Sequence, residues 1–192
     1  LGGLPSGPES TAALIAVLER SGAEDPWLRH AAVHSLERLG DESGVHRHLA
    51  HPDAHVRRAM AVVLRRWKDP AISRLLDDPH QLVRAEAARA IYDGRIVGAM
   101  GNLSRFLSTA PEGATEPITW RRAVHACREV GTAEAASILA GFAASFRGPV
   151  SVRAEAMRVL AGWTAPMTRD GILMDHRPLP GGNADHITAL KE

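Results

Sequence analysis

A nine-residue phrase that occurs twice most constrains the fold of this chain. The copies are VRAEAARAI at residues 83–91 and VRAEAMRVL at residues 152–160. In both, apolar residues occupy the first, fifth, eighth and ninth places, the spacing that lines one side of an α-helix. One such helix cannot bury its apolar side alone, whereas a row of them can do so by stacking. The sequence therefore predicts an array of helical repeats.

The composition agrees with helices throughout. Hydrophobic residues make up 45% of the chain but aromatic residues only 4%, so the interior must be filled mainly by Ala, Leu and Val. These side chains pack helices closely and fill a β-sandwich poorly. We therefore expect an all-α fold, in which chain length counts repeats rather than globular domains.

Gly and Pro residues divide the chain. Asp25-Pro26 supplies an N-cap and a first-turn proline for a helix that ends near Leu39, before Gly40. A later partner helix is expected over residues 132–146, with Ile138, Phe142 and Phe146 at helical spacing. We expect a linker at residues 1–9, the array at 10–163, and an extended Pro/Gly-rich tail lying on the array at 164–192. A short terminal helix is expected within that tail, at residues 185–192.

A longer pattern, an (Asp-)Pro turn followed by Val-Arg and then by apolar residues at helical spacing, is best seen at residues 52–64 and 78–91. It resembles the HEAT-like repeat, in the short form also found in bilin lyases, and covers roughly residues 10–163. The resemblance implies a right-handed α/α superhelix, a HEAT-like solenoid, of about four to five helix pairs. In that family the Asp and the Arg after Val form hydrogen bonds within and between repeats. The matching residues here are Asp25 with Arg29, Asp53 with Arg57, Asp78 with Arg84, and Arg153 in the last copy.

A narrower resemblance runs from residues 87–93 to the tail motifs at 163–170 and 177–179. This order is similar to the HEAT-repeat segment of large multidomain proteins of planctomycetes and their relatives. In those proteins a sorbosone-dehydrogenase-like propeller precedes the repeats and a c-type cytochrome module follows. The resemblance implies an excised central segment of an extracytoplasmic, periplasmic redox protein. The haem attachment motif Cys-x-x-Cys-His is absent from the sequence, so no cofactor is expected here.

The strongest basic cluster provides the candidate interaction residues Arg57, Arg58, Arg65 and Arg66. A basic face with an aromatic residue such as Trp67 could contact phosphate, as one glycosylase family built on HEAT-like repeats does. Against this, the net charge is only +1 and Asp69, Asp77 and Asp78 lie nearby. Nucleic acid is therefore disfavoured as a partner.

The histidines are possible metal ligands, but a structural explanation is simpler. The histidines gather in two groups, His46, His48, His51 and His55 in one and His30 with His34 in the other. One turn of helix separates His30 and His34, which could hold a metal, but no Cys or His-Glu-x-x-His motif accompanies them. We expect no metal and read these histidines as solvated or helix-terminal.

Three further groups are weighed as catalytic candidates. Cys127 occupies the place of Leu36 in the matching helix, so it reads as a small core residue. Glu86 and Glu155 occupy equivalent places in the repeated phrase and read as surface or ladder residues before general acids. We expect no enzyme activity from these residues.

Two hypotheses remain. The first is a non-catalytic scaffold that binds a protein partner or neighbouring domains of its own polypeptide. The second is a HEAT-type nucleic-acid-binding protein or enzyme, similar to a DNA glycosylase or a bilin lyase, that uses the concave face. No run of about 18 apolar residues exists, so no membrane span is expected. The compartment and the oligomeric state stay open.

Overall fold

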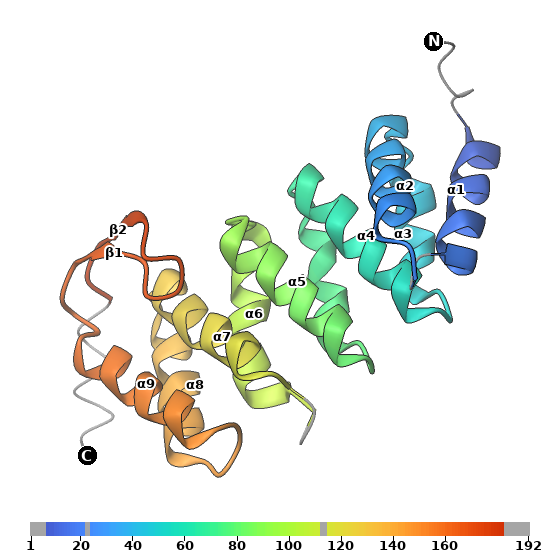
Figure 1. The fold of residues 1–192 in the computed structure, drawn as a ribbon. Coiled ribbons are helices and arrows are strands. Elements are labelled where there is room, and N and C mark those ends of the chain that lie inside the picture. The colour runs from blue at the N-terminus through green and yellow to red at the C-terminus, as the bar shows by residue number, and fades with distance from the viewer. Residues whose placement is uncertain (1–6, 22–23, 112–114, 183–192) are drawn as a thin grey trace.

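The computed structural model describes residues 7–21, 24–111 and 115–182, and this part of the chain is mostly helical (Figure 1). The all-α prediction is confirmed, apart from one short pair of strands. The elements, with η for a 3₁₀-helix, are α1 (Pro8–Ser21), α2 (Pro26–Leu39), α3 (Glu42–Arg47), η1 (His48–Ala50), α4 (Ala54–Trp67), η2 (Pro70–Asp77), α5 (Gln81–Asp93), α6 (Val97–Thr109), α7 (Pro117–Val130), α8 (Ala133–Ala144), α9 (Val150–Ala161), β1 (Met167–Arg169) and β2 (His176–Leu179).

Local sequence signals set the ends of the long helices. The Asp25 carboxylate accepts hydrogen bonds from the backbone N–H groups of Trp27 and Leu28, at 2.8 and 3.0 Å. These donors have no partner within α2, so the cap stabilises its first turn. Gly40 ends α2 in the left-handed conformation, with φ 66°. The predicted start and stop of this helix are confirmed.

Two boundaries differ from those expected. α1 begins at Pro8, inside the predicted linker, because the missing N–H of a proline costs nothing at the first helical position. α8 ends at Ala144, since Ser145 takes an extended conformation. Phe146 therefore lies beyond the helix that was expected to contain it, and it is 97% exposed.

The helices form two layers, and within each layer an element contacts the next one along the chain. One layer holds the long helices α2, α4, α5, α7 and α9, in which consecutive members touch. The other holds η2, α6 and α8, which also touch in order. Figure 1 shows the elements following one another from α1 at one end to α9 and the strands at the other. Neighbour-to-neighbour packing of this kind is what stacked repeats require.

The predicted inward positions are buried in the middle of the array. The first copy of the repeated phrase buries Val83, Ala87, Ala90 and Ile91 completely in α5. In α9 the equivalent residues are Val152, Ala156, Val159 and Leu160, of which only the first two are buried. Among the described elements, α9 packs mainly against α7 and α8, so one side of it lacks a neighbouring repeat. Equivalent apolar residues are therefore more buried in a helix that has neighbours on both sides than in one at the end of the row.

The chain after α9 folds back as a hairpin, which was not predicted. β1 and β2 pair antiparallel, with Met167 opposite Leu179 and Arg169 opposite His176. In β2 the buried residue is the charged Arg177, between exposed neighbours. A strand that turns a charge inward lacks the apolar alternation that identifies strands in a sequence. The helix predicted at residues 185–192 lies outside the described residues.

Candidate interaction surface

α4 carries the four arginines of the basic cluster, and the structure places Arg57 apart from the others. Arg57 is 8% exposed. Its Nε and Nη2 donate to the two carboxylate oxygens of Asp78, at 2.6 and 2.8 Å, and its Nη1 donates to the main-chain oxygens of His51 and Pro52. A buried guanidinium held in this way stabilises the fold and offers little to a partner. Arg57 therefore belongs to the structural residues rather than to a binding surface.

Arg58, Arg65 and Arg66 stay partly exposed, and each contacts a carboxylate of another helix. Nη1 of Arg65 lies 3.3 Å from Oε1 of Glu86 in α5. Nε of Arg58 lies 4.0 Å from the other oxygen of Glu86. Arg66 donates through Nη1 to Glu37 in α2. These carboxylates partly neutralise the cluster and weaken the field that it could offer to a phosphate backbone.

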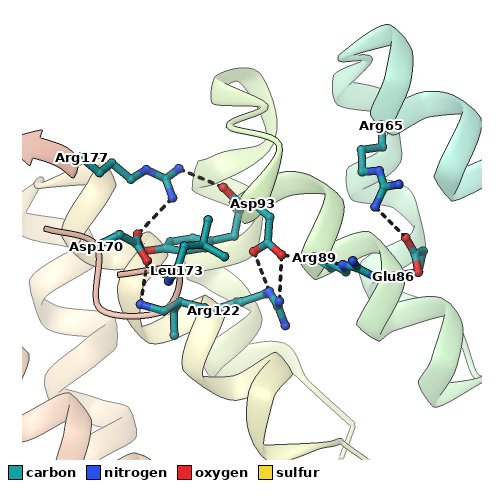
Figure 2. A network of polar contacts seen from close by, with 10 residues as sticks. Arg65, Glu86, Arg89, Asp93, Arg122, Asp170, Leu173 and Arg177 are labelled. Carbon is teal, nitrogen blue, oxygen red and sulfur yellow. Dashed lines mark hydrogen bonds and ion pairs between the residues drawn. The ribbon is translucent and has the colours of Figure 1, made fainter. Parts of the chain in front are cut away.

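Contacts of the same kind join the rest of the long-helix layer. Arg122 of α7 donates to both oxygens of Asp93 in α5, at 2.9 and 2.8 Å. Arg121 donates to both oxygens of Glu155 in α9, at 2.6 and 2.9 Å. Each pair of consecutive long helices from α2 to α9 is thus joined by one of four bridging pairs: Arg66–Glu37, Arg65–Glu86, Arg122–Asp93 and Arg121–Glu155. Figure 2 shows two of them, Arg65–Glu86 and Arg122–Asp93.

The arginines predicted to form the repeat ladder bind main-chain oxygens just before their own helices. The contacts run from Arg57 to His51 and Pro52, from Arg84 to Asp78 and Pro79, and from Arg153 to Ser145. Such contacts satisfy carbonyl groups that the turn would otherwise leave without a hydrogen bond.

The aspartates of the predicted ladder also make contacts beyond those with their predicted arginines. Asp53 caps α4 through the N–H of His55 at 2.6 Å, as Asp25 caps α2. The Asp78 carboxylate binds Arg57 of the preceding repeat, so the side-chain pairing runs between repeats. Arg29 lines a groove between α2 and α4 that also contains His30 and Arg58.

A second set of polar side chains is buried where the hairpin meets α5 and α7 (Figure 2). We call Tyr92, Glu129, Asp170 and Arg177 the hairpin cluster. The Tyr92 hydroxyl donates to Asp170, and Nη1 of Arg177 donates to the same carboxylate at 3.1 Å. Nε of Arg177 lies 2.6 Å from Oε1 of Glu129, and its Nη2 donates to the main-chain oxygen of Tyr92. These contacts fix the hairpin against both helices.

The surroundings of the hairpin cluster set the charges of its members. Burial raises the pKa of Tyr92, and the hydrogen bond to Asp170 raises it further, so the phenol stays protonated. Burial alone would raise the pKa of Asp170. Hydrogen bonds from Tyr92 and from two backbone N–H groups, together with the charge of Arg177, lower that pKa overall. A protonated phenol and an ionised carboxylate are suited to holding the hairpin in place.

Glu155 of α9 binds two side chains of α7, and one of these, Arg121, also contacts the hairpin. Nε2 of His125 lies 2.9 Å from Oε1 of Glu155, whose two oxygens also bind Arg121. Burial would raise the pKa of Glu155, but the hydrogen bonds from His125 and Arg121 outweigh it and bring the pKa to about 2. Arg121 also donates to the main-chain oxygen of Gly171, at 3.2 Å. Glu155 and its repeat equivalent Glu86 therefore both take part in bridging pairs.

Sequence reasoning missed the hairpin cluster. Tyr92, Asp170 and Arg177 lie in the segments that carry the narrower resemblance, but no role was predicted for them. A Tyr at the end of a predicted helix and two charged residues in a Pro/Gly-rich tail give no periodic signal. The one signal in the sequence that could have drawn attention to this cluster is that Tyr92 is the single tyrosine of the chain.

The histidines and Cys127 have separate surroundings. Nε2 of His46 lies 2.6 Å from Asp69, His48 contacts the main-chain oxygen of Gly44, and Nε2 of His51 lies 3.0 Å from Glu19. Within residues 7–21, 24–111 and 115–182, no three His, Cys, Asp or Glu side chains gather as metal ligands would. Cys127 is buried, and burial raises the pKa of its thiol to about 12, so it is not a thiolate at neutral pH.

Comparisons with known proteins found no relative of this chain. No family model, no curated protein and no solved structure matches this chain. In the described part of the chain, every helix is too short or too polar to cross a bilayer.

Proposed function

We propose that this chain is a non-catalytic protein-interaction module. In this proposal it is part of a HEAT-like, right-handed α/α superhelix that presents its long-helix layer to a protein partner or to neighbouring domains of a larger polypeptide. The single observation that supports it best is the set of bridging pairs. An arginine–carboxylate contact at every junction from α2 to α9 places partly exposed, mixed charges along the whole layer. Protein–protein contacts commonly have such polar surroundings.

The groups with altered pKa values support the same proposal. Glu155, Asp170 and Tyr92 each bind groups from another element, so their burial is explained by packing. Cys127, the one thiol of the sequence, stays protonated because it is buried. Perturbed titratable groups often mark catalytic sites, but structural ion-pair networks perturb pKa values too. Here the contacts favour the structural explanation.

The narrower family resemblance suggests one kind of partner. In a large extracytoplasmic redox protein, a repeat segment would act as a spacer and docking surface between catalytic modules. The spatial order of elements in Figure 1, from α1 to the hairpin, is compatible with such a role. The periplasmic setting remains part of the proposal.

Site-specific photo-crosslinking in cells that produce the full-length protein tests the proposal. Arg58 and Arg89 lie in the long-helix layer and are each replaced by p-benzoylphenylalanine, in separate variants. Ser137, exposed on α8 in the other layer, is the matched control. We expect discrete protein adducts from positions 58 and 89 and none from position 137. Adducts to nucleic acid, or no protein adduct from either test position, would overturn the proposal.

A further inference from the structure

A hollow with an unusual share of positive charge lies between the C-terminal ends of α4 and α5. Its lining residues are Arg65, Arg66, Lys68, Arg89, Asp93 and Gly94, so four of its side chains are cationic and one is anionic. We call it the basic hollow. Figure 2 shows Arg65 on one side of it and Arg89 with Asp93 on the other.

The carboxylates near the basic hollow do not balance its cations. Asp93 is already bound through both oxygens by Arg122, and its contact with Nε of Arg89 is longer, at 3.8 Å. The Arg89 side chain is 57% exposed. Arg65 and Arg66 contact Glu86 and Glu37 through Nη1 alone. Within the described residues, six cations therefore share three carboxylates: Arg58, Arg65, Arg66, Lys68, Arg89 and Arg122 with Glu37, Glu86 and Asp93.

Lys68 is held at this hollow in a conformation that side chains disfavour. It ends α4 with φ 58°, whereas the residues that end α2 and α7 in the same conformation are Gly40 and Gly131. Glycine is the usual residue there because it has no Cβ to clash with the backbone. The ammonium group of Lys68 donates one hydrogen bond, to the main-chain oxygen of Gly94, and has two more donors. Lys68 therefore keeps a cation with two further donors beside the hollow.

We propose that the basic hollow binds an acidic peptide segment of a protein partner, with side-chain carboxylates contacting Arg89 and Lys68. This proposal rests on the interaction role proposed above and specifies the chemistry of the partner. Guanidinium groups bind carboxylates through paired hydrogen bonds, and an ammonium adds a compact charge. A nucleic-acid duplex fits less well, because the excess is only about three charges and Glu37 and Glu86 stand beside it.

Fluorescence anisotropy with the purified full chain tests this proposal. The probe is a fluorescein-labelled, glutamate-rich peptide of about ten residues, and the reference is the same peptide with glutamine in place of glutamate. The test variant combines Lys68→Gly with Arg89→Gln. Glycine suits the left-handed position of residue 68, so the variant is expected to fold, which circular dichroism checks. The matched control is Arg105→Gln, because Arg105 contacts the exposed Glu134 in the other layer.

We expect the glutamate peptide to bind the wild-type chain and the glutamine peptide to bind far more weakly. The double variant should weaken binding about tenfold, and Arg105→Gln should leave it unchanged. Equal binding by all three proteins, no binding to the wild-type chain, or tighter binding to duplex DNA than to the peptide would overturn the proposal. If photo-crosslinking still captures a protein while the peptide fails, the interaction role stands and only the acidic nature of the partner is wrong.

Discussion

At the scale of single residues, the contact between α7 and the hairpin depends on how closely Gly171 approaches His125. A Cβ on Gly171 would overlap the imidazole ring. The ring has little room to move, because its side chain is 7% exposed and is held by Glu155 at 2.9 Å. The repeat pattern predicted the place of Ala123-Val124-His125 on a helix, but the partner of His125 comes from the unpredicted hairpin.

Gly171→Ala is expected to lower the free energy of unfolding by about 1–3 kcal/mol, because the added methyl group overpacks a buried contact. Denaturant unfolding measures the change. Gly141→Ala is the control. A Cβ at Gly141 meets no atom within 4 Å, so alanine there should stabilise α8 by about 0.5–1 kcal/mol. Equal stability of the two variants would contradict the described contact.

Glu155 should make stability depend on pH in the acid range. Its pKa is about 2 in the fold, below the ordinary value of 4.5 for a glutamate side chain. Because the folded value is the lower one, this carboxylate contributes stability above about pH 4.5, and that contribution is lost as the pH falls towards 2. Thermal unfolding followed over this range should therefore show a flatter profile for Glu155→Gln than for the wild type.

Glu134→Gln provides the control for that experiment. The Glu134 side chain is 63% exposed and, in the described part of the chain, forms an ion pair only with Arg105, so its replacement should leave the shape of the pH profile unchanged. If Glu155→Gln keeps the full acid-dependent loss of stability, the contacts with His125 and Arg121 do not hold the carboxylate as described.

At the scale of elements, the buried Arg57–Asp78 contact joins α4 to the start of the next repeat. The resemblance implied ladder contacts within and between repeats, but it did not name Arg57 and Asp78 as partners. Which repeat supplies the partner depends on how far one helix pair is displaced from the next. That displacement results from packing, and residue identities alone do not reveal it.

Asp78→Ala should cost about 3–5 kcal/mol, because it removes the carboxylate that binds the buried Arg57 guanidinium through two hydrogen bonds. The neighbouring Asp77 is exposed, and Asp77→Ala should change stability by no more than about 0.5 kcal/mol. Chemical denaturation of both variants gives the comparison. A loss below about 1 kcal/mol for Asp78→Ala would show that the pair does not join the repeats.

The alanines of the repeated phrase allow close approach of the long helices. Ala87 and Ala156 are fully buried, as the i, i+4 spacing predicted. Ala87→Leu and Ala156→Leu should each cost about 1–3 kcal/mol by overpacking. Ala31→Leu, at an exposed position of α2, should cost less than about 0.5 kcal/mol. Unchanged thermal stability of both test variants would mean that these positions tolerate a larger side chain.

At the scale of the whole molecule, the sequence predicted the helical content and many buried positions, but not the polar contacts between helices. Buried stripes follow from periodicity, because each helix must cover the apolar side of the next. The bridging pairs Arg66–Glu37 and Arg122–Asp93 each join residues 29 positions apart, roughly one repeat. Such partners could have been sought by shifting the sequence by one repeat. The hairpin could not have been found from the sequence in this way, because its inward residues Asp170 and Arg177 are charged.

Small-angle X-ray scattering of the full chain tests most directly the central claim that helix pairs stack in a row. A compact globular domain of 192 residues has a radius of gyration of about 16 Å. A row of pairs with α1 and α9 at opposite ends should give a clearly larger radius and a distance distribution with a long tail. A radius near 16 Å with a symmetric distribution would contradict the account.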